Sequence, residues 1–219
     1  MKKFKAAIFD MDGTLLDTMY IWRNLTREYL NSKNIPIPEE IRDKLVTMGI
    51  TKVVNLLQEY FQLGLTADEL REELYAVLGD YYRNNSVLKP GALSMLKKLQ
   101  ERNVATVILS ATPEHLLRIA LRKVDIEKYF SHGILSCASM KYTKFQPESF
   151  YTVIEHLKVD KDDVMVFEDA WYAANTAKQA GLTVAMIAEP TELKVEETRQ
   201  LADFYVEKSW DEFPVEKFF

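Results

Sequence analysis

Hydrophobic residues follow two different patterns along this chain, and the change between them predicts its organisation. Ala6–Phe9 is a short apolar run bounded by charge, which is typical of a buried strand. Over residues 18–82, apolar residues recur at helical spacing instead. The series Ile21, Leu25 and Tyr29 is one example. The chain therefore begins with one strand and continues into a helical block.

Strands alternate with helices after the turn sequence Lys89-Pro90-Gly91. Alternation of this kind predicts an α/β fold, in which helices cover both faces of a doubly wound parallel sheet. The predicted strands are 104–109, 134–135, 164–167, 183–187 and 204–206, and the predicted helices are 113–122, 150–157 and 173–180.

The helical block separates the first strand from the other strands along the sequence, so it is predicted to be an inserted domain. We expect a core of residues 1–16 and 87–219 and a helical domain of residues 17–86. The hinges are expected near residues 16–17 and 85–89. Within the helical domain, Thr66 and Glu69 have the spacing of a capping box and predict a helix start.

Composition and charge narrow the range of partners. The chain has 219 residues and a formal net charge of -5, which favours neither nucleic acid nor an anionic membrane as partner. No run approaches the ~18 apolar residues of a membrane span. The first apolar run ends at Asp10, too early for a signal peptide, and the single Cys137 excludes an intramolecular disulfide. We expect a cytoplasmic monomer.

Polar side chains follow three of the predicted strands. In a doubly wound sheet, ligands bind outside the carboxyl ends of the strands, so these residues are expected to form one site. Carboxylates this close together repel one another unless a cation lies among them, and Mg²⁺ suits oxygen ligands of this kind. The candidates are Asp10 and Asp12, Ser110 and Ala111, Glu168 and Asp169, together with Lys144 from the loop that leads toward the strand at 164–167.

Four motifs in this order resemble those of the haloacid dehalogenase superfamily. The resemblance covers essentially the whole chain, implies a Rossmann-like core with a helical cap, and extends to the β-phosphoglucomutase and phosphoglycolate phosphatase-like subgroup. The motifs are Asp-Met-Asp-Gly-Thr-Leu at residues 10–15, Ser110 at a strand end, Lys144 with Pro147, and Glu168-Asp169 with Gly181.

The resemblance implies a role for each residue. Asp10 would attack phosphorus and form an aspartyl-phosphate, while Asp12 would act as general acid and base. Ser110 and Lys144 would hold phosphoryl oxygens, with Ala111 beside them. Mg²⁺ would be bound by Asp10, the Asp12 carbonyl and Asp169, with Glu168 nearby.

Other interpretations of single residues stay open. Lys141 competes with Lys144 for the lysine position, and Thr112 is expected to cap the helix at residue 113 rather than touch substrate. Two departures from the family pattern are also present. Phe145 replaces a proline, and Ala170-Trp171-Tyr172-Ala173-Ala174 replaces the common Ser-x-x-Gly-Ile.

The expected function is hydrolysis of a small phosphate monoester, such as a sugar phosphate. A sugar phosphomutase is the first alternative, weakened because Trp22 stands where that family has a histidine. A phosphonate hydrolase is suggested by residues 48–52, although Asp12 argues against it and against a dehalogenase. A non-catalytic phosphate-binding module is the last alternative. Lys52 is expected either to meet the substrate or to be a solvated helix lysine.

Overall fold

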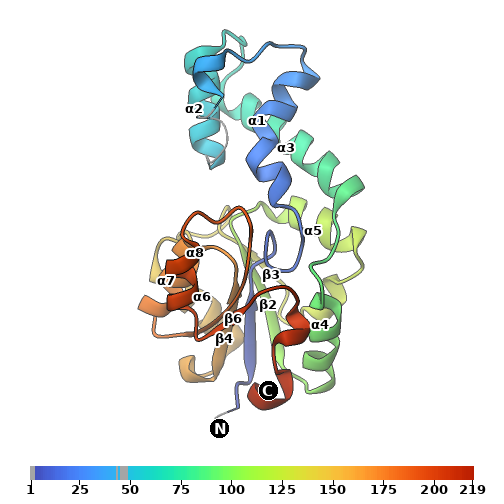
Figure 1. Cartoon of the computed structure of the whole chain (residues 1–219), viewed down its shortest axis with the longest axis vertical. Helices are drawn as coiled ribbons and strands as arrows, with labels where there is room; N and C mark the ends of the chain where they lie inside the picture. The colour runs from blue at the N-terminus through green and yellow to red at the C-terminus, as the bar shows by residue number, and fades with distance from the viewer. Residues whose placement is uncertain (1–2, 43, 45–48) are drawn as a thin grey trace. The chain divides into compact units, whose positions relative to one another are not determined.

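The structure is a computed structural model that describes residues 3–42, 44 and 49–219. It divides into two compact units, a core unit of residues 1–17 and 87–219 and a helical unit of residues 18–86 (Figure 1).

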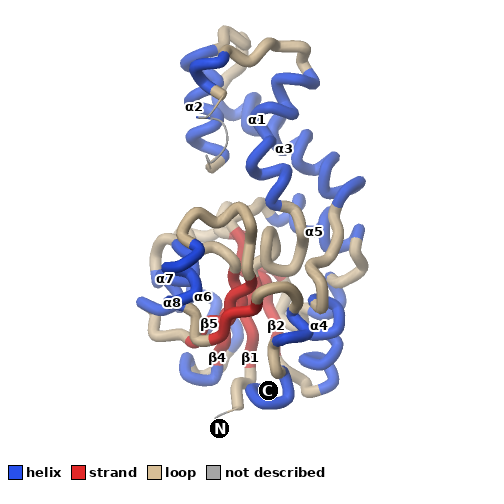
Figure 2. The backbone as a smooth tube through the Cα atoms, in the orientation of Figure 1, coloured by secondary structure: helices blue, strands red, loops and turns tan. Residues whose placement is uncertain are grey.

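The core unit is built on a parallel sheet of six strands, in the order β3-β2-β1-β4-β5-β6 (Figure 2). The chain builds outward from β1 on one side and returns to the other side with β4, so the strand order reverses between β1 and β4. This confirms the predicted α/β fold with its doubly wound sheet. The strands are β1 Ala6–Phe9, β2 Ala105–Ser110, β3 Ile134–Ser136, β4 Val164–Glu168, β5 Thr183–Ile187 and β6 Phe204–Val206.

The helices of the core unit include three that the hydrophobic pattern did not predict, α4, α8 and α9. Helix α7 begins at Trp171, two residues before the predicted start, because the Glu192 carboxylate accepts a hydrogen bond from the Trp171 amide at 2.9 Å. The helices are α4 Ala92–Glu101, α5 Glu114–Lys123, α6 Pro147–Leu157, α7 Trp171–Gln179, α8 Val195–Leu201 and α9 Val215–Phe218, with short 3₁₀ turns η3 Glu127–Tyr129, η4 Lys161–Asp163 and η5 Trp210–Glu212.

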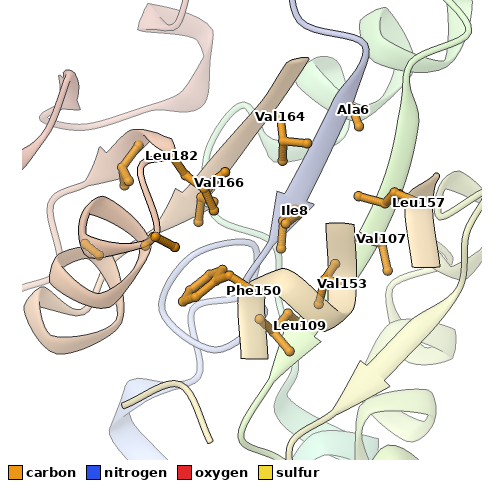
Figure 3. Close-up of a cluster of buried hydrophobic side chains, with 14 of the residues drawn as sticks. Ala6, Ile8, Val107, Leu109, Phe150, Val153, Leu157, Val164, Val166 and Leu182 are labelled. Carbon is orange, nitrogen blue, oxygen red and sulfur yellow. The ribbon is translucent and has the colours of Figure 1, made fainter. Parts of the chain in front are cut away.

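Alternate residues of the central strands pack into two separate layers. Ile8 of β1 belongs to the apolar layer that lies against α6 and α7, where Phe150 and Val153 of α6 also pack (Figure 3). Its neighbour Phe9 stacks on Phe167 of β4, with ring centroids 4.4 Å apart. Successive strand residues point to opposite faces, so β1 and β4 are buried on both sides.

The helical unit contains α1 Met19–Ser32, η1 Glu39–Ile41, α2 Ile50–Tyr60 and α3 Ala67–Asn85. The capping box is confirmed, since the Glu69 amide donates to the Thr66 hydroxyl and the Thr66 amide donates to the Glu69 carboxylate. After Ile35–Pro38 the described residues form the short turn η1. Among those residues, no helix is both long and apolar enough to cross a bilayer.

Two segments of the core unit lie where the chain leaves for the helical unit and returns. The Asp17 amide donates to the Val87 carbonyl at 3.0 Å, and the Lys89 amide donates to the Leu15 carbonyl at 2.9 Å. The Lys89 ammonium is buried against Glu189 at 2.5 Å. These contacts tie the returning segment to the loop after β1 and to the end of β5.

Gly91, at the start of α4, is predicted to be indispensable for the stability of the core unit. Its φ is +76°, and a Cβ there would lie 2.4 Å from the backbone nitrogen of Asp211. Gly133 has the same φ of +76° but open space around it, which makes Gly133→Ala a matched control. We expect Gly133→Ala to cost about 1 kcal/mol and Gly91→Ala about 3 kcal/mol of unfolding free energy in urea. Equal costs would show that the approach of η5 to Gly91 does not constrain the fold.

Candidate active site

The candidate site lies at the carboxyl ends of β1 and β4, where the strand order reverses. Asp10 directly follows β1, and Glu168 is the last residue of β4. The two strands pair with Phe9 opposite Phe167, and the Asp10 amide donates to the Phe167 carbonyl at 3.0 Å. The register therefore places Asp10 and Glu168 side by side.

Lys144 lies between these carboxylates. Its side chain is only 3% exposed, and its Nζ atom is 2.6 Å from Asp10 Oδ1 and 2.5 Å from Glu168 Oε1. Burial disfavours the charged ammonium, but the two carboxylates outweigh burial and raise the pKa of Lys144. Lys141, the competing candidate, is exposed and lies over the Tyr142 ring instead.

Asp169 completes an acidic group with Asp10 and Glu168. One carboxylate oxygen from each residue lies within 4.8 Å of the others, and all three side chains are buried. The Thr14 hydroxyl donates to Asp169 Oδ1 at 3.0 Å and holds its orientation.

The pKa values of these acids reflect the cost of packing them together. Burial raises the pKa of Asp169 well above its ordinary value, and the charges of Glu168 and Asp10 raise it further. Burial also raises the pKa of Glu168, although the Lys144 ammonium acts in the opposite direction. A divalent cation with oxygen ligands would offset this repulsion, so these residues fit a metal site.

The loop after β1 turns sharply and carries Asp12. The Met11 carbonyl accepts from the amides of Leu15 and Leu16, and the Gly13 amide donates to the Leu16 carbonyl at 2.8 Å. Gly13 adopts a φ of +84°, which a residue with a side chain rarely adopts. The turn therefore keeps Asp12 close to the end of β1.

Thr112 does not have the role expected from the sequence. Helix α5 begins after Pro113 and has no side-chain cap, so the prediction that Thr112 caps it is wrong. The Thr112 hydroxyl donates instead to Asp12 Oδ2 at 2.8 Å. Sequence spacing could not reveal this contact, because it joins the ends of two neighbouring strands.

Ser110 and Ala111 lie at the end of β2, the neighbour of β1 on the side away from β4. Ser110 is buried, and its Oγ atom accepts from the Thr112 amide at 3.1 Å. Ala111 is exposed. The end of β2 thus supplies a buried hydroxyl and an exposed stretch of backbone next to the strand that ends at Asp10.

The two segments that depart from the family motifs are in contact through Phe145 and Tyr172. Phe145 is 69% exposed, and its ring stacks on Tyr172 with centroids 4.3 Å apart and an interplanar angle of 21°. The stack joins the loop of Lys144 to the first turn of α7, which directly follows the acids of β4. Trp171 lies under Lys194, whose Nζ atom is 3.4 Å from the ring centroid, rather than in the core.

Three other residues that the sequence singles out, of which only Lys52 is predicted to meet the substrate, lie elsewhere. Lys52 is exposed in α2 of the helical unit, and its contact with substrate stays a prediction; Met48 of the same segment lies outside the described residues. Trp22 donates its indole N–H to the Tyr82 hydroxyl at 3.1 Å within the helical unit. Cys137 is buried in the core unit, and burial raises the pKa of its thiol.

Comparison with known proteins finds a matching family model and curated relatives of similar sequence. A family model described as haloacid dehalogenase-like hydrolase matches residues 4–181. The chain is 27% identical over 182 residues to a phosphorylated carbohydrates phosphatase of Thermotoga maritima, covering 81% of this chain and 82% of that protein. It is 29% identical over 192 residues to (DL)-glycerol-3-phosphatase 2 of Arabidopsis thaliana, covering 84% and 79% of the two chains.

A solved structure shares the whole fold. The crystal structure of a Thermotoga maritima protein provisionally named β-phosphoglucomutase superposes with a TM-score of 0.81, at 22% identity and with 100% of both chains covered. At this identity the likeness shows a common fold.

Removing the charge of Lys144 is predicted to destabilise the core unit. Lys144→Met leaves Asp10 and Glu168 buried without their counter-charge, which is expected to cost about 3 kcal/mol of unfolding free energy in metal-free buffer. Lys141→Met is the matched control, expected to change stability by less than about 0.5 kcal/mol because Lys141 is exposed. Urea unfolding of both variants measures the difference, and equal stabilities would contradict a charge balance centred on Lys144.

Proposed function

The chain belongs to the haloacid dehalogenase-like hydrolases, and from this premise we propose that it hydrolyses small phosphate monoesters through a phosphorylated Asp10. One observation carries the proposal above the others. Asp10 directly follows the central strand β1 as a buried carboxylate, paired with Lys144 and adjoining Glu168 and Asp169. This arrangement offers a nucleophile, a cation for phosphoryl oxygens and ligands for a metal.

The reaction takes place in two displacements at phosphorus. A carboxylate oxygen of Asp10 bonds to phosphorus while the ester P–O bond breaks, and Asp12 gives its proton to the departing alkoxide. Asp12, now ionised, takes a proton from a water molecule, which attacks phosphorus and breaks the bond to Asp10. Inorganic phosphate and the free Asp10 carboxylate result, and Asp12 is protonated again.

The phosphoryl group adds negative charge to a site that already holds several carboxylates, so positive charge must offset it. Lys144 provides one charge, and Ser110 with the backbone at Ala111 provides hydrogen-bond donors. We assign Mg²⁺ as the cofactor, held by Asp10, Asp169 and the Asp12 carbonyl with Glu168 nearby. When bound, it supplies the further positive charge that neutralises phosphoryl oxygens during transfer.

The proposed substrates are phosphorylated sugars or short polyols. Two relatives support this class by their names, a phosphatase of phosphorylated carbohydrates and a glycerol-3-phosphatase. We further propose that the helical unit acts as a cap over the site and that the exposed Lys52 of α2 meets the substrate there.

Monoester hydrolysis is favoured over phosphomutase activity by Trp22. An indole nitrogen has no basic lone pair for proton transfer, and here its N–H is already bonded to Tyr82. Phosphonate cleavage is disfavoured because it has no need of the acid at Asp12.

The nucleophile is tested by Asp10→Asn. This change keeps the size of the side chain but removes its negative charge, so phosphate release from sugar and polyol phosphates should fall by about 10³-fold or more. Asp163→Asn alters another buried aspartate, at the opposite end of β4, and is expected to keep activity. Acid quenching of the wild-type reaction should trap a phosphorylated protein that Asp10→Asn does not form. Turnover of Asp10→Asn within tenfold of wild type would refute the mechanism.

The metal is tested by binding as well as by turnover. Chelation should abolish activity, and Mg²⁺ should restore it where Ca²⁺ restores little, since Ca²⁺ prefers a looser and larger ligand shell. Calorimetry of Mg²⁺ with the protein should show binding that Asp169→Asn loses and Asp163→Asn retains. Full turnover in chelator, or unchanged Mg²⁺ binding by Asp169→Asn, would remove Mg²⁺ from this site.

A further inference from the structure

We propose that Thr112 is a positioning residue for the reaction, which aims the carboxylate of Asp12 at the leaving group and the attacking water. The inference rests on the proposed acid and base role of Asp12. Its basis is a hydrogen bond of 2.8 Å from Thr112 Oγ1 to Asp12 Oδ2, between residues 100 positions apart in the chain.

The backbone of Thr112 is held on both sides. Its amide donates to Ser110 Oγ at 3.1 Å, and its carbonyl accepts from Ser136 Oγ at 2.7 Å. Ser110 ends β2 and Ser136 ends β3, so Thr112 is tied to two strands of the sheet. The donor is therefore anchored to the ends of two paired strands of the sheet.

The side chain of Thr112 is equally constrained. It is only 2% exposed, and a β-branched residue has few accessible rotamers. Its hydroxyl makes no cap for α5, whose start has no side-chain cap. The direction in which this hydroxyl donates is consequently fixed before any substrate arrives.

Asp12 is the residue whose carboxylate this donor orients. It sits in the sharp turn after β1, beside Gly13, and its carboxylate can rotate about the side-chain bonds unless something holds it. A hydrogen bond to Oδ2 sets the plane and direction of the carboxylate. Small errors in the placement of an acid or base slow proton transfer steeply, so holding Asp12 should accelerate the steps in which it moves a proton.

Leaving-group dependence separates this role from a general structural one. An alkyl phosphate needs a proton on its departing oxygen, whereas p-nitrophenyl phosphate hardly does. Thr112→Val removes the hydroxyl at nearly constant volume and should slow single-turnover phosphorylation by glycerol phosphate about tenfold, because the transition state loses one hydrogen bond to a carboxyl group that becomes charged as it gives up its proton. Phosphorylation by p-nitrophenyl phosphate should change by less than about twofold. Thr112→Ser keeps the hydroxyl, so its rate of phosphorylation by glycerol phosphate should be close to that of wild type.

Thr106 supplies a matched control. It lies on the same strand β2, is also 2% exposed, and donates its hydroxyl to the Tyr129 carbonyl, away from the site. Thr106→Val should leave the ratio of the two phosphorylation rates unchanged. Thr112→Ala provides a second variant without the hydroxyl, and thermal melts establish that each variant is folded at the assay temperature.

The outcomes distinguish this inference from the function on which it rests. Equal slowing with both substrates by Thr112→Val and Thr112→Ala, or no slowing with glycerol phosphate, overturns the positioning role. Asp12→Asn serves as the reference, with a stronger slowing for glycerol phosphate than for p-nitrophenyl phosphate. If Asp12→Asn shows that bias and the Thr112 variants do not, only the inference on Thr112 fails. If wild type is phosphorylated by neither ester, or Asp12→Asn shows no bias, the proposed mechanism fails and the role of Thr112 with it.

Discussion

The balance of charge around Lys144 is the constraint on which the site depends. Three buried carboxylates meet at the ends of β1 and β4, and Lys144 lies between two of them at 2.5 and 2.6 Å. Burying these acids without a cation would be costly, because each repels the others in a region of low polarity. The loop that carries Lys144 must therefore close onto the sheet, and the remaining excess of negative charge favours a divalent cation.

The sheet makes this concentration of charge possible. Parallel strands end at one edge, and the reversal of strand order between β1 and β4 leaves that edge open for a ligand. Packing on both faces of the sheet holds the strand ends in register, with Ile8 facing one layer and Phe9 the other. The strong burial that stabilises the fold also gives the site its low polarity.

Loops at this edge are held by contacts that differ in kind from those of the sheet. Thr14 orients Asp169, Thr112 orients Asp12, and the stack of Phe145 on Tyr172 joins the loop of Lys144 to α7. Each contact joins segments far apart in sequence and fixes one chemical group of the site. The site is thus an assembly of short loops on a rigid sheet, which suits a reaction that needs several groups in fixed positions.

Local patterns in the sequence were sufficient for the α/β fold, the order of the strands along the chain and the capping box at Thr66, since periodicity and capping depend on neighbouring residues. They also singled out the polar residues at the strand ends, because those follow the apolar runs directly. Four features were decided only by the tertiary structure: the contacts of Lys144 with Asp10 and Glu168, the hydrogen bond of Thr112 to Asp12, the pairing of Phe145 with Tyr172 and the early start of α7. Each of these depends on contacts between residues distant in the chain, which no local pattern records.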